Sequence, residues 1–346
     1  MDAASGPLPG PPAAGPLLLR STPSNRGPVR RTTALIASIG IVAALAGCSA
    51  SSPESDCEAP FSSGDSSSAV EASGDFGSQP DVTVPSPLKV STSQVSTLIE
   101  GSGDPLEKGQ LVTIDYTLVN GADGSVLEAS PYDGESTARF AVGGSGLVGL
   151  NDGLLCTQVG SRVAIAIAPE DGFGESSAQL GISPEDTLVL VADVQSASLA
   201  RANGEQQPAP SGFPTVTLDE NGQPGLAKPS GDAPTELEIA QLKKGDGEVV
   251  EEGDQVVVAY TGWLWSTGET FDSSWEKGAP VVFTAADGST TQGGVIPGFA
   301  EALIDQPVGS QVIAIIPPDQ GYGDAEQGAI PAGSTLIFVA DILGTV

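Results

Sequence analysis

The sequence predicts an α+β protein that contains two copies of one domain, each a twisted antiparallel sheet wrapped around one short helix. The first observation is an internal repeat: residues 112–117 resemble 256–261, and residues 169–174 resemble 318–323, at an offset of about 144 to 149 residues. The second is that the apolar segments are short, rich in β-branched residues and bounded by Gly or Pro, as strands are. The third is that each copy has a single helical segment.

In the second copy we expect strands over residues 256–260, 279–284, 311–316 and 335–342. The helical segment spans residues 297–304, with Pro297 at the first helical position and Phe299, Leu303 and Ile304 near one face. Burial of that apolar stripe against the inner face of the sheet would give each copy its core.

The first 47 residues have the features of an export signal. We expect residues 1–47 to form a disordered extension and a signal peptide, since two arginines precede an apolar run over 34–46 that is too short to span a membrane. Residues 45–48 resemble the lipobox of bacterial lipoproteins, which predicts a lipid on Cys48 that anchors an exported protein to the outer face of the cytoplasmic membrane. The alternative is an incidental cysteine that follows an ordinary signal peptide.

The next segment, residues 48–81, is rich in Ser, Gly and acidic residues and predicts a flexible tether. Cys57 lies in this tether and Cys156 lies in the first copy. An exported protein meets conditions that permit disulfides, so the two cysteines either form a bridge or remain one buried and one exposed thiol. Two thiols without histidine do not make a zinc site, and we expect no metal.

The two copies are expected to occupy residues 82–200 and 234–346, joined by a linker over residues 201–233. The linker is rich in Pro and Gly, with one short strand over residues 215–218. Residues 219–222 lack the acidic ladder of a calcium loop and predict a hairpin turn.

Composition excludes several classes of function. A net charge of −31 repels phosphate backbones, so we expect no nucleic-acid partner. The chain has no histidine, which removes histidine-dependent triads, general bases and metal sites. Residues 144–149 spell GxGxxG, but the short helical segment that follows and its antiparallel setting do not fit a dinucleotide site, and we interpret the motif as a turn. No cofactor is therefore expected.

The second copy carries ordered clusters that resemble the FK506-binding protein (FKBP) family of peptidyl-prolyl cis-trans isomerases. They are residues 258–262, 271–274, 295–299, 321–323, 330–331 and 336–338. The resemblance implies two FKBP-like domains and a prolyl isomerase that assists the folding of exported proteins. The partners it implies are proline-containing polypeptides and macrolides of the FK506 class.

The resemblance also assigns roles by matching position. It implies a catalytic group of Asp272, Tyr322, Phe299 and Tyr260. It implies that substrate is bound by Phe271, Phe283, Val295, Ile296, Ile330 and Phe338. In this pattern Phe299 is the floor beneath the prolyl ring, the Tyr322 hydroxyl and the Ile296 N–H anchor substrate carbonyls, and Asp272 holds the Tyr260 hydroxyl.

Both copies depart from the family pattern. In the second copy, Phe299 stands where Trp is frequent and the loop over residues 285–294 is longer than usual, which bears on macrolide affinity and substrate preference. The first copy differs more, with Leu127-Glu128 in place of Phe-Asp, Leu150 as the floor, Phe173 without a hydroxyl and Leu190 as a wall. We therefore predict weak or absent isomerase activity in the first copy.

Two other classes of function use the same residues. One is a non-catalytic chaperone or binding module for proline-containing segments. The other is a lipoprotein that binds small hydrophobic molecules, which the polar rim of Asp272 and Tyr322 disfavours.

Overall fold

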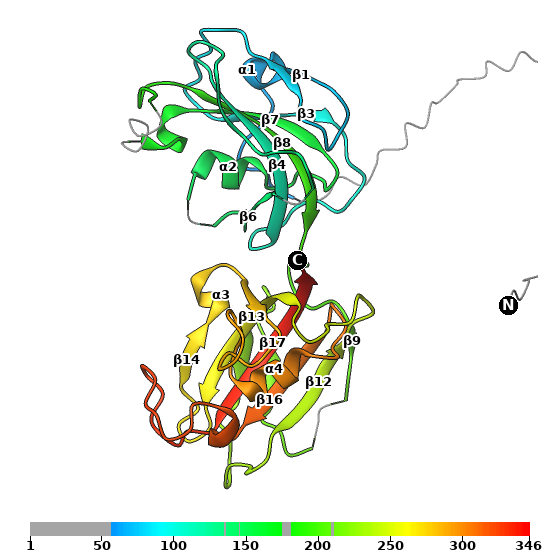
Figure 1. The fold of residues 1–346 in the computed structure, drawn as a ribbon, viewed down its shortest axis with the longest axis vertical. Coiled ribbons are helices and arrows are strands. Elements are labelled where there is room, and N and C mark those ends of the chain that lie inside the picture. The colour runs from blue at the N-terminus through cyan, green and yellow to red at the C-terminus, as the bar shows by residue number, and fades with distance from the viewer. Residues whose placement is uncertain (1–56, 135, 145, 175–180, 209–210) are drawn as a thin grey trace, which may run out of the picture. The chain divides into compact units, whose positions relative to one another are not determined.

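The computed structural model describes residues 57–346 except 135, 145, 175–180 and 209–210 (Figure 1). The predicted signal peptide and the lipid site at Cys48 lie outside these residues. No helix within the described part of the chain is long and apolar enough to cross a membrane.

The first domain contains an antiparallel sheet in the order β3-β7-β8-β4-β5, with β6 also paired to β4. Its strands are β3 (Gln94–Ile99), β4 (Leu111–Asn120), β5 (Val126–Ala129), β6 (Ala138–Ala141), β7 (Arg162–Ile167) and β8 (Leu188–Ala197). One short helix, α2 (Val148–Gly153), packs on β7, and a 3-10 turn, η1 (Pro169–Asp171), follows that strand.

The second domain repeats this order as β12-β16-β17-β13-β14, with β15 paired to β13. Its strands are β12 (Glu238–Lys244), β13 (Gln255–Leu264), β14 (Thr270–Ser273), β15 (Val281–Thr284), β16 (Gln311–Ile316) and β17 (Leu336–Thr345). Helix α4 (Pro297–Leu303) lies on the sheet, and the shorter elements are α3 (Ser274–Lys277) and η3 (Pro318–Gln320) (Figure 1). The predicted α+β class is confirmed, and the edge strands β12 and β14 are additions to the predicted set.

Each sheet is buried on both faces. In β8 the side chains of Leu188 and Leu190 face the core beneath α2, whereas Val189 and Val191 belong to a separate cluster on the outer face. This alternation follows from the two-residue period of a strand. An apolar outer face needs a cover of its own.

In the first domain that cover is the segment of residues 57–90, which we call the first strap. It contains α1 (Asp65–Ser68), β1 (Glu71–Ser73) and β2 (Asp81–Thr83), and its Val70 and Leu88 are buried against the outer face. The prediction of a flexible tether over residues 48–81 is therefore wrong from Cys57 onward. A few well-spaced apolar residues within Ser- and Gly-rich sequence suffice to bury the outer face.

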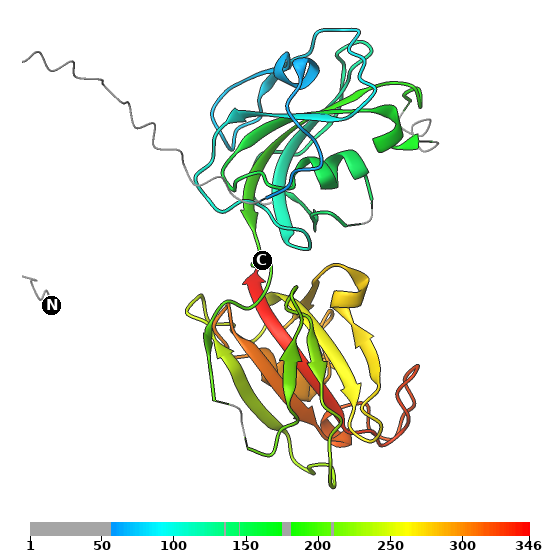
Figure 2. The ribbon, with the colours of Figure 1, turned by 180° about the vertical axis from the view of Figure 1, so that it is seen from behind.

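The second domain has an equivalent cover, the second strap, formed by residues 201–208 and 211–233. It contains β9 (Glu205–Gln206), which pairs with β12, and the hairpin of β10 (Val216–Leu218) and β11 (Pro224–Leu226). Phe213, Val216 and Leu226 pack over a cluster that includes Trp263 and Trp265. The β10–β11 hairpin lies on the face of the sheet opposite α4 (Figure 2). The predicted hairpin is confirmed, but the linker is part of the second domain's packing.

In each domain a buried carboxylate, at the equivalent position of β8 or β17, accepts a hydrogen bond from the strap backbone. In the first domain Asp193 accepts from Gly77 N at 2.7 Å and forms an ion pair with the fully buried Arg162 at 2.5 Å. Arg162 also donates to the carbonyls of Gly74, Asp75 and Ser78. A disulfide between Cys57 and Cys156, with Cα atoms 5.7 Å apart, fixes the start of the first strap and answers the question that the sequence left open.

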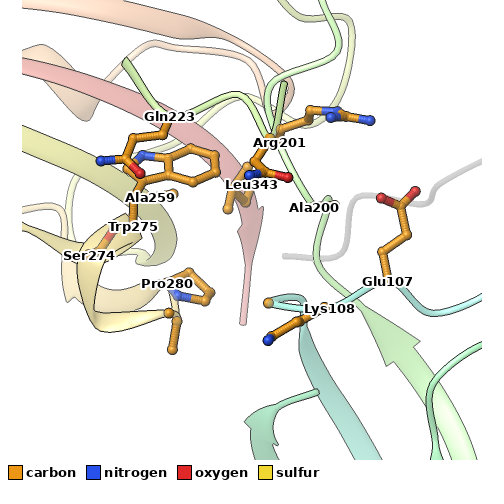
Figure 3. A pocket seen from close by; sticks show the side chains of 14 residues that line it. Glu107, Lys108, Ala200, Arg201, Gln223, Ala259, Ser274, Trp275, Pro280 and Leu343 are labelled. Carbon is orange, nitrogen blue, oxygen red and sulfur yellow. The ribbon is translucent and has the colours of Figure 1, made fainter. Parts of the chain in front are cut away.

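In the second domain the equivalent carboxylate is Asp341, which accepts from Ala202 N at 2.8 Å and from Gln311 Nε2 at 2.7 Å. Lys243 Nζ donates to the Ala202 carbonyl at 2.8 Å. Trp275 packs near Ala259 and Leu343 (Figure 3), and Leu199 packs against the same apolar cluster. The repeat therefore extends to the way in which each strap is held.

Candidate functional site

The predicted pocket residues come together between the inner face of the second sheet and the start of α4. They surround a cavity of about 560 Å³. The predicted residues that line it are Tyr260, Phe271, Asp272, Phe283, Val295, Ile296, Phe299, Tyr322 and Phe338. Ile330 is placed differently: it does not line the cavity, is 5% exposed and packs in the core cluster that also contains Phe299 and Phe338.

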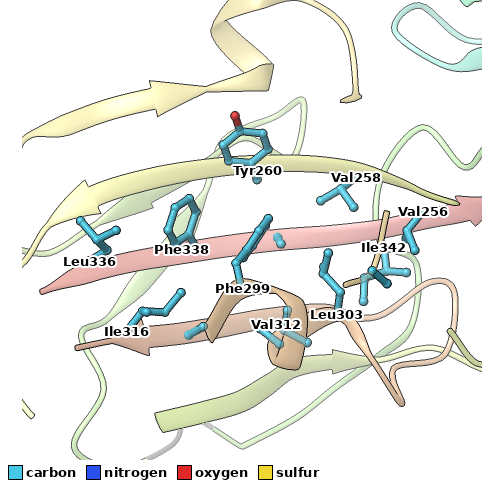
Figure 4. Packing of buried hydrophobic residues seen from close by; sticks show 14 of the residues in the cluster. Val256, Val258, Tyr260, Phe299, Leu303, Val312, Ile316, Leu336, Phe338 and Ile342 are labelled. Carbon is cyan, nitrogen blue, oxygen red and sulfur yellow. The ribbon is translucent and has the colours of Figure 1, made fainter. Parts of the chain in front are cut away.

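Aromatic rings form the floor and walls of this cavity. The Phe299 ring on α4 points toward Phe338 and Tyr260, with ring centroids 4.6 and 5.9 Å away (Figure 4). Phe283 lies 6.0 Å from Phe299 and meets it edge-on, and Phe271 meets Phe338 in the same way at 5.5 Å. Such tilted and edge-to-face pairs fix the rings in place and add to the burial energy.

Local backbone features place the floor and one wall. Pro297 occupies the first position of α4, where its missing N–H leaves no hydrogen bond unmade. A side chain on Gly298 would collide with Ile316, so glycine lets α4 lie close on β16. A side chain on Gly262 would likewise occupy the space of the Phe271 ring.

The polar rim is built around Asp272. Its carboxylate accepts from the Tyr260 hydroxyl at 2.6 Å and from Lys277 Nζ at 2.5 Å. Partial burial acts to raise the pKa of Asp272, but the hydrogen bonds from Lys277 and Tyr260 outweigh it and hold this pKa below its usual value. Asp272 is therefore an ionised, paired group with little basicity left for proton transfer.

The sequence of the turn explains why Lys277 reaches Asp272. Ser273 caps α3 by accepting from Glu276 N, and the left-handed Gly278 (φ 77°) ends that helix after one turn. This brings Lys277, in the last turn, back to the carboxylate. Sequence reasoning assigned the Tyr260 hydroxyl to Asp272 and missed Lys277.

Two hydrogen-bond donors in the cavity wall are free to meet a ligand. The described residues provide no acceptor for the Tyr322 hydroxyl or for the Ile296 N–H. Burial and the nearby Asp272 charge raise the pKa of Tyr322, so its hydroxyl keeps its proton. The pKa of Tyr260 is also raised, by burial and by its bond to Asp272.

The equivalent place in the first domain keeps one part of this arrangement. The Tyr116 hydroxyl donates to Glu128 Oε1 at 2.8 Å, and burial together with Glu128 raises the pKa of Tyr116 to about 12. The tyrosine–carboxylate pair therefore survives the change from Asp to Glu, which the sequence comparison had counted as a loss. Leu150 and Phe173 pack in this domain's core where the second domain has Phe299 and Tyr322.

The cavity contains further residues that sequence reasoning did not select. They come from the long loop after β15 and are Asp287, Gly288, Ser289 and Gly294. The only sequence signal for them was the length of the loop.

The second domain thus combines an aromatic cavity and two free donors with a sheet that wraps around a short helix. Residues 103–194 and 247–343, more than half of the chain, match the family model "FKBP-type peptidyl-prolyl cis-trans isomerase". The chain belongs to this family of enzymes.

Named relatives agree with that assignment. An FK506-binding protein of Streptomyces anulatus is 39% identical over 123 residues, which span 35% of this chain and 95% of that protein. A probable FK506-binding protein of Corynebacterium glutamicum is 34% identical over 121 residues, which span 35% of this chain and 97% of that protein. Among solved structures, the three FKBP domains of wheat FKBP73 match 73% of this chain and 94% of that chain with 23% identity and a TM-score of 0.32.

Proposed function

We propose that the second domain isomerises X-Pro bonds in exported polypeptides, using the cavity above Phe299. The observation that carries the proposal is the pair of unengaged donors, the Tyr322 hydroxyl and the Ile296 N–H, in the wall of an aromatic cavity. They fit two substrate carbonyls on either side of a prolyl ring that rests on Phe299.

The chemistry suits a site without a nucleophile or a histidine. Rotation about a peptide C–N bond has a barrier of about 18 to 20 kcal/mol, set by amide resonance, and no covalent bond breaks. An enzyme lowers this barrier by binding the twisted amide more tightly than either planar isomer. Groups that only hold and desolvate the substrate are therefore sufficient.

We assign the residues to that task as follows. The apolar walls strip water from the carbonyl before the proline, which weakens the charge-separated resonance form that keeps the amide planar. The fixed donors hold the chain on each side of the bond while it rotates. Asp272, neutralised by Lys277, orients the Tyr260 hydroxyl and shapes the rim.

We also propose that the protein works outside the cytoplasmic membrane, held by a lipid on Cys48. The disulfide between Cys57 and Cys156 supports this location, because such bonds persist in oxidising compartments. Mass spectrometry of the protein from the membrane fraction should find a lipidated Cys48 at the N-terminus. A free thiol at that position in mature protein would contradict the anchor.

Macrolides of the FK506 class are proposed as competing ligands, since relatives carry that name. Such a ligand should inhibit turnover and bind with one molecule per chain, in the second domain. Binding that survives Phe299→Ala would place the macrolide elsewhere.

The function is tested by a cis-to-trans prolyl peptide assay on residues 49–346, compared with Tyr322→Phe. Loss of one hydrogen bond that strengthens in the transition state costs about 1 to 1.5 kcal/mol, so kcat/KM should fall roughly tenfold. Peptide binding without acceleration by the folded protein would instead indicate the alternative, a non-catalytic chaperone or binding module.

A further inference from the structure

We propose that Asp287 makes the second domain select client segments that carry Lys or Arg next to the proline. This inference rests on the proposed function, because it names the substrates of the same cavity. It concerns the loop between β15 and α4, residues 285–294, which is outside the group of residues that the family resemblance assigns.

The charges that line the cavity come from two carboxylates, Asp272 and Asp287. The charge of Asp272 is compensated by Lys277. Asp287 has no ion-pair partner among the described residues, and its carboxylate accepts a hydrogen bond from Ser289 N at Oδ1, at 2.8 Å. A backbone N–H does not neutralise a carboxylate, so the rim keeps one unpaired negative charge.

The loop holds this charge in a fixed place. Thr290 N and Thr291 N donate to the Asp287 carbonyl at 3.1 and 2.9 Å, which closes a tight turn. At the base of the loop, Gly288 N donates to the Val295 carbonyl at 2.8 Å, and Asp287 is bridged to Val295 in a parallel arrangement. The carboxylate is therefore positioned on a hydrogen-bonded loop.

Two glycines allow this close arrangement. The backbones of Gly288 and Gly294 pass so near each other that a side chain on either would collide with the other's backbone. The loop that they close ends at Val295, whose neighbour Ile296 carries one of the free donors. A client whose carbonyl accepts from the Ile296 N–H would therefore lie in the same cavity as Asp287, beside the loop that carries it.

A cationic side chain near the proline would gain an ion pair with Asp287, and an acidic one would be repelled. The net charge of −31 adds a field of the same sign over the whole surface. Both effects favour basic clients and weaken in high salt.

The test compares peptides of one sequence that carry Lys, Gln or Glu on either side of the proline. At low salt, the wild-type protein should favour the Lys peptide over the Glu peptide by about tenfold in kcat/KM on one side of the proline. Asp287→Asn keeps an oxygen for the Ser289 N–H and should reduce this ratio to about twofold, as should about 1 M salt. Asp287→Lys should invert the preference.

Asp319→Asn is the matched control, because Asp319 is exposed, lies in the same domain and does not line the cavity. It should leave the preference unchanged. Turnover with equal rates for Lys and Glu peptides, or a preference that Asp287→Asn does not alter, would overturn the inference while the isomerase function stands.

Peptide titrations followed by NMR separate the two proposals further. If no peptide is isomerised but Lys peptides bind more tightly than Glu peptides in an Asp287-dependent way, the function fails and the selectivity stands. If no peptide is isomerised and Lys and Glu peptides bind equally well, both the isomerase function and the selectivity proposal fail.

Discussion

The two domains share a sheet order and a way of holding the preceding strap, yet they differ at the pocket floor and at the buried strap carboxylate. The second domain has Phe299 and Tyr322 where the first has Leu150 and Phe173. The first domain pairs Asp193 with a cation, whereas the second gives Asp341 only neutral donors from Gln311 and Ala202. Strap packing and core burial thus preserve the fold in both copies, while a few side chains distinguish the pocket for which we propose activity from the equivalent place in the first domain.

The largest expected effect is on the strap of the first domain. Arg162→Ala leaves the Asp193 carboxylate buried without its cation and leaves three strap carbonyls without a donor. We expect the free energy of unfolding of the first domain to fall by about 3 to 5 kcal/mol. The equivalent Gln311→Ala removes one neutral hydrogen bond and should cost the second domain about 1 to 3 kcal/mol.

Urea denaturation followed by two signals distinguishes the domains. The three tryptophans, Trp263, Trp265 and Trp275, all lie in the second domain, so fluorescence reports on that domain and far-UV circular dichroism reports on both. Arg162→Ala should shift the circular dichroism transition and leave the fluorescence transition in place. Equal losses in the free energy of unfolding for Arg162→Ala and Gln311→Ala would show that the charged contact of the first domain stabilises its strap no more than the neutral contact of the second.

The next effect concerns the pocket floor. Phe299→Leu gives the second domain the aliphatic floor of the first, and it removes the ring contacts with Phe338, Tyr260 and Phe283. We expect kcat/KM for a prolyl peptide to fall about tenfold to a hundredfold. Leu150→Ala, the control in the first domain, should leave turnover unchanged. A loss of turnover in this variant would show that the first domain contributes to catalysis.

A smaller, pH-dependent effect concerns the buried Asp341 of the second domain. Burial raises the pKa of Asp341, and the bonds from Ala202 N and Gln311, together with the nearby charge of Lys243, only partly oppose it. A raised folded-state pKa contributes stability below the usual value of 3.8, and this contribution is lost as pH rises through the raised pKa.

Asp341→Asn cannot ionise, so its stability relative to wild type should increase between pH 3 and pH 7. Urea titrations at several pH values, read by tryptophan fluorescence, measure this change. A stability difference that stays constant across that range would mean that the pKa of Asp341 is not raised in the folded protein.

Much of this fold follows from local pattern, and the remainder depends on contacts that no pattern contains. Strands such as β16 and the helix α4 lie where β-branched runs and Pro297 place them. The straps were missed because Val70, Leu88 and Phe213 are isolated apolar residues whose burial depends on a distant sheet face. Composition alone made these segments resemble a tether and a linker.

The residues of the site also fall into two groups, those that the sequence could predict and those that only the structure shows. The aromatic residues could be placed because the family pattern fixes their order. Lys277 could not, because its contact with Asp272 requires the single turn of α3, and Glu128 was discounted because only the structure shows Tyr116 reaching it. The disulfide depended on a distance between Cys57 and Cys156 that only folding of the first strap sets.

The most direct test is the isomerase activity of protein containing both domains after Phe299→Leu and Tyr322→Phe are combined. These changes make the second pocket resemble the first at its floor and at one donor. We predict that prolyl peptide turnover falls to the uncatalysed rate, with both unfolding transitions retained. Turnover that persists at a substantial fraction of the wild-type rate would contradict the account, because it would place activity in the first domain or outside the pocket above Phe299.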